Sequence, residues 1–253
     1  MEKLVQNKEN MNTNSNRRSL LKTVGGVTAA GVMGTLGFGI SEVAFAASLT
    51  KAERDKMTPD EIIKGLQKGN KRFLSGKPEK HDYLAQKRAS AAGQFPSAII
   101  LSCIDSRAPA EIILDTGIGE AFITRVAGNI SNDDILGGME FACKLMGAKL
   151  IVVMGHSGCG AVRGAIDNAK LGNLTGLLDK IKPAIAATPA GTYVGERVGS
   201  NYAFVDAVAK TNVQQTIENL RKGSQVLRDL EKEGKLKMVG AMYGLKGGVV
   251  EFF

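Results

Sequence analysis

Residues 150–160 read LIVVMGHSGCG, and they give the strongest indication of the fold. Its first five residues are apolar without interruption, which is typical of a strand buried on both faces of a parallel sheet. A glycine-rich turn follows and carries His156 and Cys159. A second apolar run, AIIL at residues 98–101, leads in the same way toward Cys103. Because ligand sites in open parallel sheets form at the carboxyl ends of strands, these three side chains are predicted to lie at one edge of a sheet.

The rest of the chain supplies the elements that such a sheet needs. Residues 121–126 (AFITRV) are a third strand candidate. Apolar spacing and start signals predict further elements: helices at 58–75, near 133–146, within 159–187 and within 200–233, and strands at 237–243 and 249–253. Strands that alternate with helices imply right-handed crossovers. The sequence therefore predicts an α/β fold, a single domain at residues 47–253 with a mostly parallel central β-sheet flanked by helices.

Composition limits the kind of site that this domain can hold. Three cysteines exclude a disulfide framework, because at most one bridge could form. Two histidines exclude a multi-histidine metal site, so a site that uses histidine must use His81 or His156. The formal net charge is +8 and shows no basic stripe along the sequence. This pattern argues against nucleic acid as a partner and suits an anionic substrate or product.

The first 46 residues are predicted to lie outside the domain. Arg17-Arg18 precedes a Gly/Ala/Val-rich apolar stretch at 23–39, and Ala44-Phe45-Ala46 then matches the small-x-small pattern of a signal-peptidase site. The arrangement resembles a twin-arginine export signal. The resemblance implies cleavage of residues 1–46, the twin-arginine translocase as a partner during export, and a periplasmic or other extracytoplasmic location. The alternative is an N-terminal membrane anchor, because residues 23–40 approach the ~20 residues that span a bilayer.

The side chains at the predicted sheet edge favour a zinc site. Two thiolates and one imidazole are a suitable zinc set, and three protein ligands leave a fourth position for water or another ligand. Other interpretations stay open from the residues alone. A buried cysteine is usually a small apolar side chain, as we expect for Cys143. The glycine-rich segment 155–164 could bind phosphate, although it lacks the spacing of the nucleotide motifs. Asp105 and Arg107 could form a structural ion pair.

Two motifs in order add a family resemblance. Residues 103–107 read CIDSR, and residues 156–160 read HSGCG. Together with GNKRF at 69–73, RVAGN at 125–129 and GAMY at 240–243, they make residues 58–253 similar to the β-class carbonic anhydrases. The resemblance implies one Zn²⁺ per chain. Its ligands would be Cys103, His156 and Cys159, and its catalytic pair would be Asp105 and Arg107. We also assign Gly160, the residue after Cys159, to substrate binding.

The resemblance implies the reaction and the assembly. The expected reaction is the reversible hydration of carbon dioxide to bicarbonate and a proton by hydroxide formed at the zinc. The expected assembly is a homodimer or a higher even oligomer, in which the apolar face of the helix at 59–75 packs on a neighbouring copy. Two alternatives remain. One is hydrolysis of carbonyl sulfide or carbon disulfide on the same scaffold. The other is a non-catalytic zinc-binding protein whose closed site has Asp105 as a permanent fourth ligand.

Overall fold

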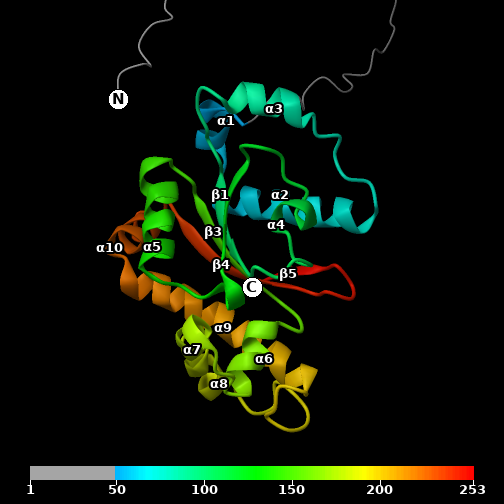
Figure 1. The fold of residues 1–253 in the computed structure, drawn as a ribbon. Coiled ribbons are helices and arrows are strands. Elements are labelled where there is room, and N and C mark those ends of the chain that lie inside the picture. The colour runs from blue at the N-terminus through cyan, green and yellow to red at the C-terminus, as the bar shows by residue number, and fades with distance from the viewer. Residues whose placement is uncertain (1–48) are drawn as a thin grey trace, which may run out of the picture. The chain divides into compact units, whose positions relative to one another are not determined.

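A computed structural model describes residues 49–253 of the chain (Figure 1). The predicted export signal at 1–46 lies outside the described residues. A five-stranded sheet has the order β2-β1-β3-β4-β5. Its strands are β1 (Ala98–Ser102), β2 (Ala121–Arg125), β3 (Leu150–His156), β4 (Lys237–Tyr243) and β5 (Val250–Phe252). Within the described part, β4 and β5 pair antiparallel and the other neighbours pair parallel. The predicted α/β class with a mostly parallel sheet is therefore confirmed.

The two apolar runs form the centre of this sheet. Every residue of β1 and β3 is buried, as expected for strands covered on both faces. The register pairs Ser102 with Met154 and His156 with Tyr243. The chain thus leaves β1 directly before Cys103, while β3 ends on His156, so both residues reach the same edge of the sheet.

Helices cover both faces of the sheet. One face packs against α2 (Pro59–Leu74) and α4 (Ala110–Ile113). The other packs against α5 (Asp133–Glu140), the π-helical turn η2 (Phe141–Leu145), α9 (Tyr202–Gly223) and α10 (Gln225–Lys232). Figure 1 shows α2 and α4 on the opposite side of the strands from α5 and α10. The remaining short elements near these layers are α1 (Lys51–Lys56), α3 (Tyr83–Ser90) and the 3₁₀ turn η1 (Ala127–Asn129).

A third apolar cluster contains Cys103 and Cys159. It is built by α6 (Gly160–Ile166), α7 (Gly172–Asp179), α8 (Lys182–Ala187) and the N-terminal half of α9. In Figure 1 the orange helix α9 lies between the strands and this group of short helices. The two thiols at the sheet edge are therefore surrounded by apolar side chains.

Helix α2 begins as its sequence predicts and packs differently from the expectation. The Thr58 hydroxyl accepts from the Glu61 N–H while the Glu61 carboxylate accepts from the Thr58 N–H, a capping box with Pro59 in the first turn. Its apolar residues Ile62 and Leu66 are 2% and 7% exposed because they pack on the sheet of their own chain. The prediction that this face packs on a neighbouring copy is therefore wrong for both residues.

Several predicted helices are divided more finely in the structure. The helices predicted within 159–187 are three short ones, and Pro183, expected to interrupt a helix, lies in the first turn of α8. The span 200–233 divides at Ser224, whose hydroxyl accepts from the Leu227 N–H and starts α10. The starts of α8 and α10 follow local signals, Pro183 and Ser224, that the apolar spacing does not reveal.

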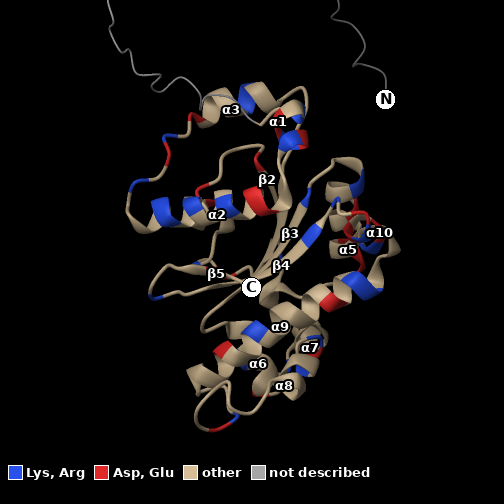
Figure 2. Ribbon diagram, turned by 180° about the vertical axis from the view of Figure 1, so that it is seen from behind, with Lys and Arg blue, Asp and Glu red and all other residues tan. Residues whose placement is uncertain are grey.

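The charged residues of the described part lie mainly on its helices. Figure 2 shows basic and acidic residues interspersed along α2 and α10, while most of the sheet carries neither. Among residues 49–253, no helix combines the length and the apolar character needed to cross a bilayer.

Candidate metal centre

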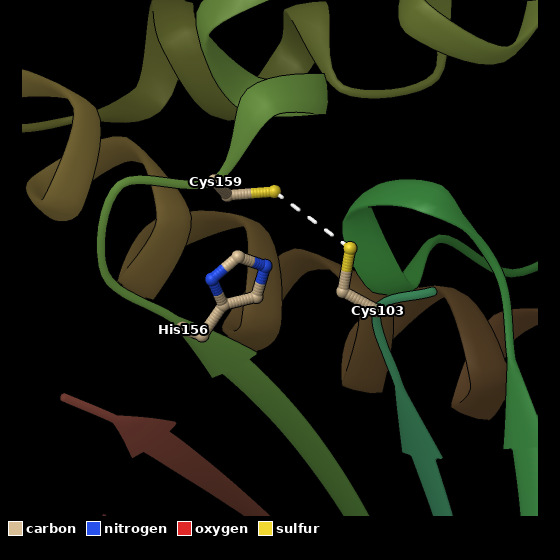
Figure 3. A group of neighbouring side chains, drawn as sticks. All are labelled: Cys103, His156 and Cys159. Atoms are coloured by element: carbon tan, nitrogen blue, oxygen red, sulfur yellow. Dashed lines mark hydrogen bonds between the residues drawn. The ribbon is translucent and has the colours of Figure 1, made fainter. Parts of the chain in front are cut away.

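Three elements bring the predicted ligands together. Cys103 follows β1, His156 is the last residue of β3, and Cys159 is the residue before α6 (Figure 3). Their ligand atoms lie within 4.8 Å of one another, and the two Sγ atoms are 4.0 Å apart. All three side chains are buried. The prediction that these residues meet at one edge of the sheet is confirmed.

His156 presents one defined ring nitrogen to this group. Its Nδ1 lies 2.9 Å from the Ser157 carbonyl oxygen, so Nδ1 carries the proton and donates it there. Its Nε2 is buried and has no hydrogen-bond partner within the described residues. A neutral imidazole whose other nitrogen is held by a carbonyl is the usual form of a metal-binding histidine.

The environment shifts the pKa values of the two thiols in opposite directions. Hydrogen bonds with the Cys159 thiol and from the Gly128 N–H hold the pKa of Cys103 below its usual value. The Gly128 nitrogen is 3.3 Å from the Cys103 sulfur. The same contact, together with burial, raises the pKa of Cys159. The two sulfurs thus hold one proton between them, and a bound cation would release that proton.

The donor set fits zinc. Bonds of about 2.3 Å from a tetrahedral zinc to two thiolates place the sulfurs about 3.8 Å apart, close to the observed separation of 4.0 Å. The unpartnered Nε2 of His156 supplies the nitrogen ligand. Cys143 is separate: it is buried in the cluster that contains η2, and burial raises the pKa of its thiol to about 12. That thiol matches the predicted role of a small apolar side chain.

Asp105 and Arg107 form a fork beside the three ligands. The Arg107 Nε and backbone N–H donate to Asp105 Oδ1 over 3.0 Å each, and Nη2 donates to Oδ2 over 2.8 Å. Hydrogen bonds from this guanidinium hold the pKa of the Asp105 carboxyl well below its usual range. Asp105 Oδ2 lies 3.8 Å from Nε2 of His156. An ionised carboxylate thus faces the position of a metal while both its oxygens are held by Arg107.

Arg125 is a functional residue whose role the sequence did not indicate. Its Nε donates to the Cys103 carbonyl over 2.8 Å and its Nη2 donates to the Asp105 carbonyl over 2.6 Å. This clamp fixes the backbone that carries both side chains. The signal available in the sequence was its place at the end of the predicted strand 121–126, and the structure pairs it with Ser102.

The two remaining site candidates lie in different surroundings. Gly160 begins α6, and a Cβ built on it would meet no atom within 4 Å. Its assignment to substrate binding stays a prediction. His81 pairs with Asp115, whose Oδ1 lies 3.2 Å from the His81 Nε2. Within the described part, His156 is thus the histidine that joins the two thiols.

Comparisons with known proteins agree with this geometry. The family model described as "Carbonic anhydrase" matches residues 98–250. Carbonic anhydrase 2 of Mycobacterium tuberculosis is 36% identical over 186 residues, which are 73% of this chain and 88% of that protein. The β-carbonic anhydrase CafA of Aspergillus fumigatus superposes with a TM-score of 0.60 at 25% identity, over 77% of this chain and 89% of that one. A tetrameric β-carbonic anhydrase of Sordaria macrospora gives 0.56 at 25% identity, over 64% and 83%.

Proposed function

The chain belongs to the β-carbonic anhydrase family, and from this membership we propose that it catalyses the reversible hydration of carbon dioxide to bicarbonate and a proton. One observation carries the proposal. The ligand atoms of Cys103, His156 and Cys159 lie within 4.8 Å of one another, beside the Asp105 carboxylate that Arg107 holds. The cofactor is one Zn²⁺ per chain, bound by these three side chains.

The residues around the metal have separable tasks. Bound Zn²⁺ supplies the nucleophile by lowering the pKa of a coordinated water. With the metal held by Cys103, His156 and Cys159, the Asp105 carboxylate would accept a hydrogen bond from the attacking water and orient it toward carbon dioxide. Arg107 holds both carboxylate oxygens and so keeps Asp105 away from the metal. Because the Arg107 side chain is 62% exposed, its charge also attracts the bicarbonate anion as it leaves.

Stopped-flow measurement of carbon dioxide hydration, with zinc content determined on the same sample, tests the proposed activity. We expect about one zinc per chain and rapid hydration. Zinc without hydration would favour a non-catalytic protein with a closed site. Hydrolysis of carbonyl sulfide without hydration of carbon dioxide would favour the alternative activity, a carbonyl sulfide or carbon disulfide hydrolase. Both results would overturn the proposal.

We further propose that the chain assembles as a homodimer or a multiple of one through the edge of its sheet. Strand β2 lies at that edge, and all five of its residues are only half-buried. Beside it, Ile112 and Ile118 are 63% and 43% exposed and line a hollow together with Ile123 of β2. An open edge strand with apolar neighbours favours pairing with another chain. The tetrameric state named for the Sordaria macrospora relative supports an even-numbered oligomer.

The substitutions Ile112→Glu and Ile118→Glu together are expected to shift this assembly toward the monomer, because two charges would be buried at the interface. Sedimentation velocity over a range of concentrations measures the effect. Val194→Glu is the matched control, because Val194 is 86% exposed away from the β2 edge. An unchanged oligomer in the double variant would contradict the proposed interface.

We also propose that the protein is exported in the folded state by the twin-arginine route. Folding before export lets zinc load in the reducing cytoplasm, where Cys103 and Cys159 stay thiols. Replacing Arg17 and Arg18 by Lys is expected to trap active enzyme inside the cell, measured by activity in separated cell fractions. Replacing Lys3 and Lys8 by Arg is the control for altered basic residues near the N-terminus. Unaltered export of the Arg17/Arg18 variant would favour the general secretory route or an anchor.

A further inference from the structure

Helix α9 packs directly against the loop that carries two of the three metal ligands. A Cβ on Gly155, the residue before His156, would lie 2.8 Å from a methyl of Val213 and 3.6 Å from the Ala209 carbonyl. Both of these residues belong to α9. A side chain here would also come within 2.8 Å of the Met242 sulfur, so the absence of one lets the side chains of Val213 and Met242 pack closely on the end of β3.

Asp206 of α9 holds the turn between His156 and Cys159. Its Oδ1 accepts from the Gly158 N–H over 2.7 Å. Gly158 has a φ of +60°, a left-handed backbone conformation that favours glycine. The turn therefore contains one residue whose conformation other residues rarely adopt. A charged acceptor makes a short, strong hydrogen bond to such an N–H. The spacing of His156 and Cys159 therefore depends on a carboxylate about 50 residues later in the chain.

Asn212 of the same helix holds the other side of the site. Its Nδ2 donates to the Gly128 carbonyl over 2.7 Å, and the side chain is 2% exposed. The N–H of this same Gly128 donates to the Cys103 sulfur over 3.3 Å. Gly128 has a φ of +68°, and a Cβ there would clash with Ile181. The Gly128 N–H, which donates to the Cys103 sulfur, is thus held in place by the buried side-chain amide of Asn212.

We propose that Asp206 and Asn212 are positioning residues that make α9 a rigid support for the metal site. They are six positions apart, about 9 Å along a helix axis. One holds the loop of His156 and Cys159, and the other holds the loop beside Cys103. The inference rests on the proposed function only in requiring that the site binds zinc. Neither residue touches the metal or the substrate; each acts through a glycine of the loop that it holds.

Zinc affinity of the full-length protein tests this role without measuring catalysis. The apoprotein is titrated with zinc against a chromophoric chelator, and the cobalt(II) form is recorded for its thiolate charge-transfer bands. Asp206→Ala and Asn212→Ala are each expected to weaken zinc binding by roughly 10- to 100-fold, as loss of an outer partner of a metal ligand does. Both should also change the cobalt spectrum. Asp206→Asn keeps an acceptor oxygen for Gly158 and should restore most of the affinity.

Asp167→Ala is the matched control. Asp167 Oδ1 also accepts a glycine N–H, that of Gly199 over 3.0 Å, but this contact belongs to neither ligand loop. It should leave zinc affinity within twofold and the cobalt spectrum unchanged. Asp206→Leu and Asn212→Leu, which fill the space without the hydrogen bond, replace the alanine variants if these do not fold.

The outcomes separate this inference from the proposed function. Wild-type affinity in the Asp206 and Asn212 variants would overturn the inference, and so would an equal loss in Asp167→Ala. A wild-type protein that binds no zinc would overturn the proposed function, and the positioning role with it.

Discussion

Replacement of Cys159 by alanine is expected to remove zinc and hydration activity together. The variant keeps two ligands, Cys103 and His156. It lacks the Cys159 sulfur, which lies 4.0 Å from that of Cys103 and would bind the same cation. Loss of a ligand should weaken zinc binding by more than roughly 100-fold, the upper end of what loss of an outer partner costs. Without the metal, no group in the described site lowers the pKa of water. Metal analysis and stopped-flow hydration on one sample measure both losses, and Cys103→Ala and His156→Ala should behave alike.

Cys143→Ala is the control for this experiment. Cys143 is as buried as the ligand cysteines, but it packs in the cluster that contains η2, and burial raises the pKa of its thiol to about 12. Its removal should therefore leave zinc content and activity unchanged. Full zinc occupancy in Cys159→Ala, or loss of zinc in Cys143→Ala, would contradict the assignment of the ligands.

Arg107→Lys is expected to retain zinc and lose most of the hydration activity. Lysine keeps the positive charge but lacks the planar fork that now binds both oxygens of Asp105. The freed carboxylate lies 3.8 Å from Nε2 of His156, close enough to turn toward the metal and occupy the fourth position. We expect a loss of about 100-fold or more in turnover, the range of a lost acid–base or orienting group.

Two further measurements make the Arg107 prediction specific. The cobalt(II) form of Arg107→Lys should show a carboxylate in the coordination sphere in place of water. Arg221→Lys is the control, because Arg221 makes an equivalent fork with Glu231 over 2.9 Å for each contact, away from the metal site. Normal turnover in Arg107→Lys would reduce its contact with Asp105 to a structural salt bridge.

The local sequence pattern predicted a mostly parallel sheet and placed Cys103, His156 and Cys159 at one of its edges, where the structure brings them together. The runs at 98–101 and 150–154 are apolar on both sides of the strand, and this local pattern predicts central parallel strands. Parallel strands end at a common edge, so Cys103 and His156 had to come close together even though they are far apart in the chain. The contact between Asp105 and Arg107 was predictable for a different reason: the two residues are two positions apart in one short turn.

The contacts that hold these residues in place come from the packing of distant segments. The clamp of Arg125 on the Cys103 loop, the bond from Asp206 to Gly158 and the bond from Asn212 to Gly128 each join segments more than 19 residues apart. Ile62 and Leu66, on the apolar face of α2, likewise pack on the sheet of their own chain and not on a neighbouring copy. Apolar spacing reports only whether a residue faces inward. The partner that a side chain meets is decided by how the elements pack, which no local pattern records.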